Sequence, residues 1–469
     1  MNVMDLTQET ARPARTSQRR LTFGLCINIV AIAFETIAVA TAMPIAAREL
    51  GGLSYYAWSF SLFLIGMLFS TVLAGRLSDR IGPAKPLLIG LTVFVVGLVI
   101  AGTAEHMLQL VGGRLVQGLG SGVINTAIFV CVAQAYSEAQ RPKVFTYIST
   151  AWVLPAFVGP PAAAWLTETL SWHWVFYAVV PLVVTGGVLV WPSLRRLMAD
   201  FRATEADPAG PGPAPLWAAA VVALAAAALQ LAGQRLDWLA LALLVAGAVG
   251  LVLALPRLMP GCFARFERGL ASVVIVRGLL AGAFVGGEAF LPLMLVEEKR
   301  LPLVLAGGVL TVASVGWLTG SWLQSRPGLT IRRDRLITWG CLSVALGLGL
   351  VSVSAFVESV PYGLVAVAWI FSGFGMGLAT SSTGLAVMSL SREAEQGRNG
   401  SSLNLSDALG SGLFVGVSGT LFAALHGTGN LPLTFGTLLL TMTVVAVLAA
   451  LSSLRIGALA SNAASRSAG

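Results

Sequence analysis

GRLSDRIGPAKPLLIG, residues Gly75–Gly90, is a short basic hairpin between two apolar runs, at about residues 55–77 and 87–104. Each run is long enough to cross the hydrocarbon core of a membrane as a helix, which takes about 20 apolar residues. The polar turn carries Arg80 and Lys85, and basic turns of this kind stay on the cytoplasmic side. The hairpin therefore predicts a membrane protein and orients two of its helices.

The composition extends this prediction to the whole chain. Of 469 residues, 56% are hydrophobic and 11% are charged, whereas a soluble domain carries about 25% charged residues. The net charge of +8 does not indicate a nucleic-acid partner, because the basic residues lie in small groups between apolar runs. The four cysteines lie far apart without metal-binding spacing, so we expect neither a zinc site nor a disulfide framework.

The apolar runs predict about 14 membrane helices in an all-α polytopic fold. They lie at about 22–47, 55–77, 87–104, 107–136, 144–167, 174–194, 216–233, 238–256, 270–295, 303–324, 335–356, 361–389, 400–425 and 431–455. We expect two pseudo-symmetric six-helix bundles plus two extra linker helices. The expected parts are a cytoplasmic N-terminal tail (1–21), an N-terminal six-helix bundle (22–194), a cytoplasmic linker with two additional transmembrane helices (195–269), a C-terminal six-helix bundle (270–456) and a cytoplasmic tail (457–469).

The basic residues fix the orientation of the spans. With the N-terminus inside, 23 of the 29 Lys and Arg residues fall in cytoplasmic segments and four in outer loops, while Arg114 and Arg277 lie within spans. No cleavable signal peptide is expected, because the first apolar run is long enough to span the bilayer. We expect a multi-pass protein of a bacterial cell (inner) membrane, with both termini in the cytoplasm.

The hairpin also carries a candidate gate. Gly75 permits close helix contact, Gly82 permits a tight turn, and Asp79 can accept hydrogen bonds from a helix N-terminus. The segment resembles the Gly-x-Leu-x-Asp-Arg-x-Gly-Arg-Lys loop of the major facilitator superfamily. That resemblance implies a cytoplasmic gate built from Gly75, Asp79, Arg80 and Gly82, with Asp79 latched to the helix start at Asn399–Ser402. The alternative is a solvated basic loop.

A second segment, GGRLVQGLGSG (Gly112–Gly122), resembles the superfamily's Arg-x-x-Gln-Gly-x-Gly motif. Arg114 then lies at membrane depth, where a charge usually faces a cavity or a partner. The resemblance implies a role in proton transfer, and implies close helix packing at Gly118 and Gly120. The alternative is that Arg114 extends outward to the lipid headgroups.

Further segments resemble the 14-helix drug:proton antiporter branch of that superfamily. PAFVGPPAAA (Pro155–Ala164) keeps the Gly159-Pro160 pair of the antiporter helix-packing motif, although a simple proline kink is the alternative. FETIAVATAMP (Phe34–Pro44) and SWHWVFYAVVP (Ser171–Pro181) resemble that branch's signatures at the first and sixth spans.

Few ionisable groups lie deep in the predicted spans. Glu35, Glu288 and Asp407 are carboxylates at membrane depth, and Arg277 shares a span with Glu288. Apolar surroundings favour the neutral form of a carboxyl group, so such a group can take up a proton on one side and release it on the other. The alternative for each is a neutral, hydrogen-bonded structural carboxyl. With Arg114, these four residues are the candidate proton-coupling and substrate residues.

We therefore expect a secondary active transporter, a proton-coupled exporter of amphipathic or lipophilic small molecules working by alternating access. Export of lipid or glycolipid is the alternative transport function, and a non-transporting membrane sensor or enzyme is the second alternative. The sequence holds no nucleotide-binding loop, and we expect no enzymatic activity. We expect no cofactor, with the proton gradient as energy source. The expected partners are membrane lipids and small lipophilic or cationic substrates, and we expect a functional monomer.

Overall fold

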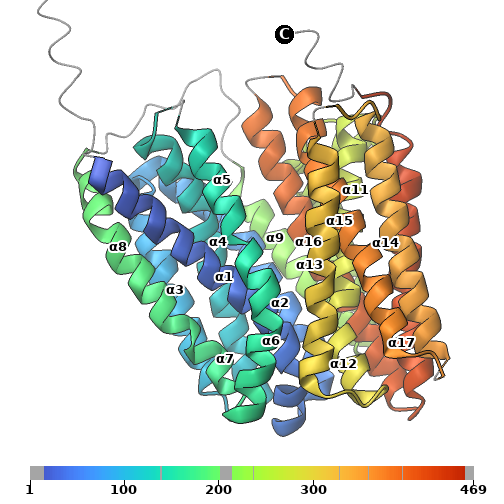
Figure 1. The fold of residues 1–469 in the computed structure, drawn as a ribbon. Helices are drawn as coiled ribbons and strands as arrows, with labels where there is room; N and C mark the ends of the chain where they lie inside the picture. Colours follow the sequence, from blue (N-terminus) through green and yellow to red (C-terminus); the bar gives the residue numbers. More distant parts are fainter. Residues whose placement is uncertain are drawn as a thin grey trace, which may run out of the picture.

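The computed structural model describes residues 15–137, 140–200, 214–235, 237–326, 328–357, 359–392 and 395–459, and these ranges contain helices and no strand (Figure 1). Most of the two predicted tails, 1–21 and 457–469, lies outside the described residues. In the figure the helices stand side by side and run between two faces of the molecule. We call the face at which the first helix begins and the last one ends the terminal face, and the opposite one the distal face.

Two bundles and a helical pair make up the chain. The first bundle consists of α1 (Arg15–Glu49), α2 (Tyr56–Ile81), α3 (Ala84–Gly102), α4 (Met107–Ala135), α5 (Arg141–Ala151), α6 (Val153–Thr169), α7 (His173–Tyr177) and α8 (Val179–Asp200). The pair is α9 (Leu216–Ala232) and α10 (Trp238–Leu258). The second bundle consists of α11 (Leu270–Glu288), α12 (Leu291–Glu297), α13 (Leu303–Ser325), α14 (Arg333–Phe356), α15 (Tyr362–Leu390), α16 (Gln396–His426) and α17 (Leu431–Ser453).

The two bundles repeat one packing scheme. In the first, α4 packs against α2 and α3, and α1 packs against α6 and α8. In the second, α15 packs against α13 and α14 in the same way, and α11 packs against α16 and α17. Within the described residues, 12 helical segments are long and apolar enough to cross a membrane. The predicted fold class, an all-α membrane protein of two pseudo-symmetric bundles with two extra helices, is confirmed.

Prolines explain why three predicted spans are interrupted. α5 ends at Ala151, α7 at Tyr177 and α11 at Glu288. Each of these ends lies four residues before a proline, namely Pro155, Pro181 and Pro292. Proline has no backbone N–H and therefore cannot bond to the carbonyl four residues earlier. The fifth predicted span is consequently two short helices, α5 and α6, and neither reaches spanning length alone. The seventh predicted span also falls short of spanning length, because α9 has only 17 residues.

Glycines bring α4 close to its neighbours. A Cβ atom at Gly118 would collide with the Phe63 carbonyl of α2, and one at Gly120 would lie 2.5 Å from the Phe94 backbone nitrogen of α3. Gly159 of α6 has more room, since a Cβ atom there would lie 3.6 Å from the Ile37 side chain. The close approach at Gly118 and Gly120 therefore holds α2, α3 and α4 together.

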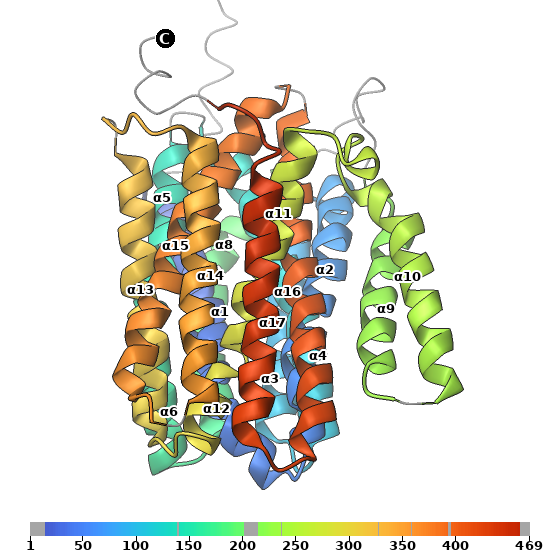
Figure 2. The ribbon, with the colours of Figure 1, turned by 90° about the vertical axis from the view of Figure 1, so that its right-hand side faces the viewer.

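The bundles meet mainly where α2 packs against α16 and α6 against α13, with smaller contacts of α1 with α12 and α13. The Pro160 carbonyl of α6 lies against Gly307 of α13, and the Ser314 hydroxyl of α13 donates to the Ala156 carbonyl of α6 (3.1 Å). Beside this seam, α9 touches both α2 and α16, while α10 lies outermost (Figure 2). Trp58 Nε1 of α2 donates to Gln234 Oε1 after α9 (2.7 Å). The pair is thus attached to both bundles through α9.

Replacing Gly118 with Ala should destabilise the protein, because the added methyl group meets the Phe63 carbonyl. We expect the loss typical of overpacking, about 1–3 kcal/mol, seen as a lower unfolding temperature of purified protein by tryptophan fluorescence. Gly112→Ala is the matched control, because it lies in the same helix and a Cβ atom there has no neighbour within 4 Å. Equal unfolding temperatures for the two variants would contradict this packing.

Candidate functional site

Glu35 of α1 and Arg114 of α4 form a buried ion pair in the first bundle. Arg114 Nη1 donates to Glu35 Oε1, and the two side chains are 2% (Arg114) and 0% (Glu35) exposed. The sequence predicts both as candidates but does not predict that they pair, because they lie 79 residues apart. Removing two charges from water is costly unless they bond to each other and to further polar groups. The pair is therefore the feature of this bundle that most needs an explanation.

Further contacts hold the guanidinium of Arg114 inside the bundle. Its Nε donates to the Ser59 carbonyl of α2 (2.9 Å), and its Nη1 also donates to Gln117 Oε1 one turn along α4 (2.5 Å). The guanidinium lies 4.3 Å from the centre of the Phe63 ring. Three helices thus surround one charge. Arg114 does not reach outward to headgroups, so that alternative is wrong in this structure.

The second oxygen of the Glu35 carboxylate is not hydrogen-bonded within the described residues. Glu35 Oε2 is buried and has no hydrogen-bond partner among the described residues, and the same holds for Gln117 Nε2. An unpaired buried carboxylate oxygen costs free energy. A proton would remove the charge of this carboxylate, and a cationic group of a ligand would pair with the free oxygen. Glu35 thus has one oxygen paired with Arg114 and one oxygen unpaired.

A second ion pair lies in the other bundle. Arg277 Nε of α11 donates to Asp407 Oδ1 of α16 (2.5 Å), and Arg277 Nη1 donates to Thr383 Oγ1 of α15 (3.4 Å). The side chains are 13% and 35% exposed, so this pair is less dehydrated than the first. The sequence predicts both residues as candidates but does not predict that they pair.

Glu288 lies where α11 is interrupted. It is the last residue of α11, and the carbonyl of the next residue, Ala289, accepts a hydrogen bond from Tyr56 Oη of α2 (2.8 Å). No hydrogen bond or ion pair of the Glu288 carboxylate occurs in the described part of the chain. Glu288 and Arg277 remain apart, as their spacing of eleven residues predicts. The helix end at Glu288 is therefore tied to the first bundle through the adjacent carbonyl.

Aromatic rings fill the space one turn before Glu288. Phe284 stacks on Trp369 with 5.1 Å between ring centres, and Trp317 packs against Phe284 at 6.0 Å. Trp369 is fully buried, and its Nε1 has no partner within the described ranges. No sequence motif singles out Phe284 or Tyr56, so both contacts became visible only with the fold.

A surface ion pair links the bundles near the distal face. Arg48 at the end of α1 donates to Glu297 at the end of α12, 249 residues away. Tyr56 adds its hydrogen bond to Ala289, and its ring packs at 5.1 Å from that of Phe290. The bundles are therefore joined at their distal ends by polar and aromatic contacts.

The residues of the predicted cytoplasmic gate lie at the end of α2 and are not latched to the second bundle. Gly82 ends α2 with φ of 77°, a backbone conformation that favours glycine. Gly75 lies within α2 with no neighbour within 4 Å of a Cβ position. Asp79 and Arg80 are exposed, and no described residue forms an ion pair or hydrogen bond with either. Asn399 donates instead to Ser391 Oγ (2.9 Å). The predicted latch between Asp79 and Asn399–Ser402 is thus not formed in this conformation.

In the described residues no group of three or more His, Cys, Asp or Glu side chains could hold a metal ion. The ionisable residues predicted at membrane depth thus form two ion pairs and leave Glu288 by itself, and the buried amides Asn28 and Gln230 are further polar side chains inside the described helices.

The buried pair should show strong energetic coupling. Glu35→Gln or Arg114→Gln alone should lower the unfolding free energy by about 3–5 kcal/mol, because each leaves a buried charge without its partner. The double variant should cost clearly less than the sum, in a double-mutant cycle measured by denaturant unfolding in detergent. Arg48→Gln is the control at an exposed pair and should cost at most about 1 kcal/mol. Additive effects at Glu35 and Arg114 would reject the coupling.

Comparison with known proteins gives the relatives of this chain. The family model described as Major Facilitator Superfamily matches residues 24–415. The chain is 25% identical over 387 residues to "Multidrug resistance protein 3" of Bacillus subtilis (strain 168), covering 79% of this chain and 72% of that protein. It is 28% identical over 192 residues to "Multidrug transporter protein MdtP" of the same organism, covering 41% of this chain but 35% of that protein.

Solved structures share the fold. A crystal structure of the peptide transporter POT in complex with sulfate matches with a TM-score of 0.69 and 14% identity, over 97% of this chain and 99% of that chain. A POT family transporter in complex with a thioalcohol-conjugated peptide matches with a TM-score of 0.68 and 16% identity, over 91% and 95%. At such identities the likeness concerns the fold alone. Since the family model spans most of the sequence, this chain belongs to the Major Facilitator Superfamily.

Proposed function

We propose that this transporter is a proton-coupled exporter of amphipathic or lipophilic small molecules that works by alternating access. The observation that carries the proposal is the buried Glu35–Arg114 pair with its unpaired Glu35 Oε2. A dehydrated carboxylate with an open position, in a bundle that moves against another, has the properties of a proton carrier. The names of the multidrug relatives support the class of substrate.

Protonation of Glu35 would act on how α1 packs against α4. A proton on Glu35 removes the negative charge that Arg114 faces and weakens the pair. The Ser59 carbonyl and Gln117 Oε1 still hold the guanidinium, so Arg114 stays with α2 and α4. α1 is then less tightly held. In this way a proton changes the packing of one helix without unfolding the bundle.

The same helix reaches the contact between the bundles. Arg48 follows Glu35 by 13 residues along α1, a rise of about 20 Å. Arg48 pairs with Glu297 of α12, so a displacement of α1 would move Arg48 relative to Glu297 and weaken this distal ion pair. Glu288 lies in the second bundle beside the Tyr56–Ala289 hydrogen bond. We assign Glu288 as a second protonation or cation-binding group that acts on this contact.

The orientation of basic residues supports placing the terminal face in the cytoplasm, since 23 of 29 basic residues belong to segments on that side of the predicted topology. The distal contacts then close the outer side. The exposed Asp79, which is not latched to the second bundle, supports a conformation in which the bundles are separated on the cytoplasmic side. On this proposal the structure corresponds to an inward-facing state, and the latch from Asp79 to Asn399–Ser402 forms in the outward-facing one.

Neutralising either carboxylate should abolish coupling. In proteoliposomes with an imposed pH gradient, Glu35→Gln and Glu288→Gln should each lower ethidium transport at least tenfold, because the amide in place of either carboxyl cannot exchange a proton. Glu105→Gln, at an exposed acid outside the membrane helices, is the control and should transport as the wild type does. Size-exclusion chromatography checks that each variant is folded.

Undiminished gradient-driven transport in both folded variants would reject the assignment. Absence of gradient-driven transport by the wild type, for ethidium and for a second lipophilic dye such as Hoechst 33342, would reject multidrug export itself.

Locking the distal contact should also stop transport. Arg48→Cys and Glu297→Cys together, linked by a short bismaleimide, should reduce ethidium transport to background, because the outer side cannot open. The control is each variant that carries only one of the two introduced cysteines, treated with the same reagent. It shows any effect of the reagent on the four native cysteines. Full transport by the cross-linked protein would contradict alternating access through this contact.

A further inference from the structure

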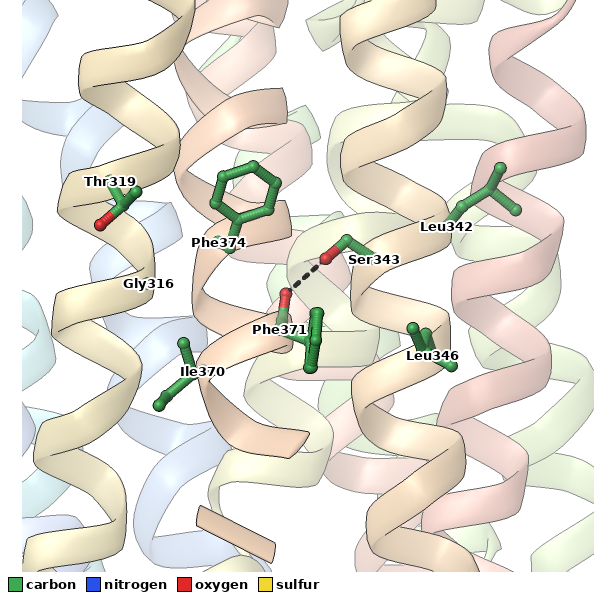
Figure 3. A pocket seen from close by; sticks show the side chains of 8 residues that line it. All are labelled: Gly316, Thr319, Leu342, Ser343, Leu346, Ile370, Phe371 and Phe374. Atoms are coloured by element: carbon green, nitrogen blue, oxygen red, sulfur yellow. Dashed lines mark hydrogen bonds between the residues drawn. The ribbon is translucent and has the colours of Figure 1, made fainter. Parts of the chain in front are cut away.

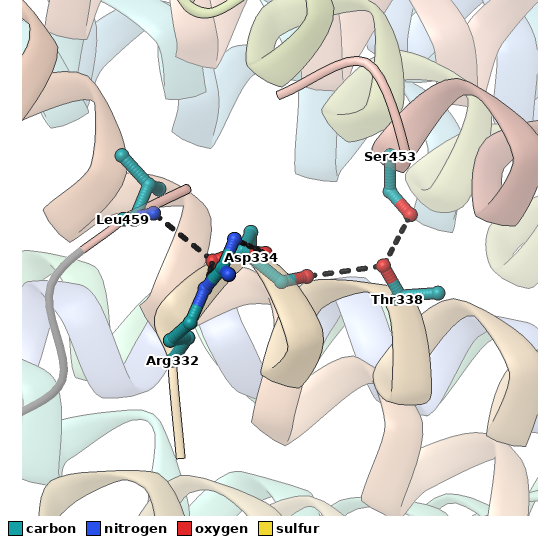
Figure 4. Close-up of polar contacts among 5 residues, drawn as sticks. All are labelled: Arg332, Asp334, Thr338, Ser453 and Leu459. Carbon is teal, nitrogen blue, oxygen red and sulfur yellow. Dashed lines mark hydrogen bonds and ion pairs between the residues drawn. The ribbon is translucent and has the colours of Figure 1, made fainter. Parts of the chain in front are cut away.

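A polar cavity lies at the terminal end of α14, outside the machinery proposed for transport. Figure 4 shows the polar contacts among residues in and beside its wall. Its volume is about 520 Å³, and its walls include Arg332, Arg335, Trp339, Ser453 and Leu454. The cavity lies between the start of α14 and the end of α17.

Most of its polar groups already have partners. Asp334 accepts from Arg332 Nη2 (2.8 Å) and from the Leu459 backbone N–H (3.0 Å), which ties the chain after α17 to α14. The Thr338 and Ser453 hydroxyls lie 2.7 Å apart and bond to each other. The acid and the hydroxyls are therefore structural parts of the cavity wall.

Arg335 is the exception. It is exposed, and none of the described residues forms an ion pair or hydrogen bond with its side chain. It lies in the first turn of α14, where the helix dipole already favours an anion. Trp339 is one turn further on, 50% exposed, with its indole N–H free to donate. The cavity thus offers the positive charge of Arg335 and the Trp339 donor, while its lining acid, Asp334, is engaged by Arg332 and the Leu459 N–H.

An apolar groove continues along the same face of α14. Arg335, Trp339, Leu342 and Leu346 are spaced four, three and four residues apart, which places them on one side of the helix. Leu342 and Leu346 line a groove of about 470 Å³ between α13, α14 and α15 (Figure 3). From Arg335 to Leu346 the helix rises about 16 Å. A polar anchor and an apolar groove therefore follow each other along one helix face.

The groove is suited to hydrocarbon. Ser343, its central polar side chain, donates to the Phe371 carbonyl (2.7 Å) and so has a partner. Leu342, Leu346 and Phe371 are 48%, 51% and 41% exposed. In a membrane-spanning chain such surfaces meet acyl chains.

We propose that this face binds an anionic phospholipid, with its phosphate at Arg335 and Trp339 and one acyl chain in the groove of α13, α14 and α15. A free phosphate would leave the groove empty. A zwitterionic lipid would bring a second positive charge next to Arg335, and the acid of the cavity wall, Asp334, is already bonded to Arg332 and to the Leu459 N–H. The charge and the groove together select an anionic lipid.

Lipid add-back to the purified, delipidated transporter tests this site. Dioleoylphosphatidylglycerol should raise the unfolding temperature several degrees more than dioleoylphosphatidylcholine does. Arg335→Gln should remove this difference, and Thr319→Phe, which fills the groove, should reduce it. Arg398→Gln, an exposed arginine at the start of α16, is the matched control and should retain it. Arg335→Lys, which keeps the charge, should retain most of it.

Equal stabilisation by the two lipids, or a difference that persists in Arg335→Gln, would overturn the proposal. The same stabilisation by glycerol 1-phosphate, which has no acyl chain, would show a phosphate site without a lipid and would also overturn it. Native mass spectrometry of the wild type provides a measurement that needs no variant. Retention of phosphatidylglycerol over phosphatidylcholine from mixed micelles is expected, and equal retention would contradict the site.

Discussion

The ion pair of Glu35 and Arg114 is the interaction on which the rest of this structure depends. Two opposite charges at 0% and 2% exposure sit inside a helical bundle that has lipid around it. Such a pair rarely stabilises a protein more than apolar side chains of the same size would, because dehydrating both ions is costly. Its presence is better explained by a task that needs a titratable group. The Ser59 carbonyl, Gln117 and Phe63 hold Arg114 and leave Glu35 as the member of the pair that can change.

Glycines and prolines give the helices near the two carboxylates different properties. Glycines bring α2, α3 and α4 into close contact, which makes them a firm support for Arg114. Prolines have the opposite effect in α5–α6, α7–α8 and α11–α12, where each removes one backbone hydrogen bond and leaves a joint. One joint lies at Glu288, beside the hydrogen bond from Tyr56 to Ala289. The protein thus has close helix contacts around the Glu35–Arg114 pair in the first bundle and an interrupted helix at Glu288 in the second.

The sequence predicts the architecture well, because hydropathy and basic loops report directly on spans and sides. It also predicts that Arg114 needs a partner, since a charge at membrane depth is costly alone. It does not predict which partner, because Glu35 approaches only when α1 packs against α4. Arg277 and Asp407, and Arg48 and Glu297, are likewise joined by packing across 130 and 249 residues. The latch of Asp79 depends on conformation, which a motif does not specify. The break at Ala151 follows from Pro155, a signal present in the sequence but outweighed there by the continuous apolar run.

We propose that a proton and a cationic substrate compete for the unpaired oxygen of Glu35, so that a protonated Glu35 loses its proton when substrate binds. Infrared difference spectroscopy of the reconstituted transporter, recorded with and without ethidium, tests this most directly. The account predicts the loss of a protonated-carboxyl band on binding, and the absence of that change in Glu35→Gln. The same band change in Glu35→Gln, or no change of any carboxyl group in the wild type, would contradict it.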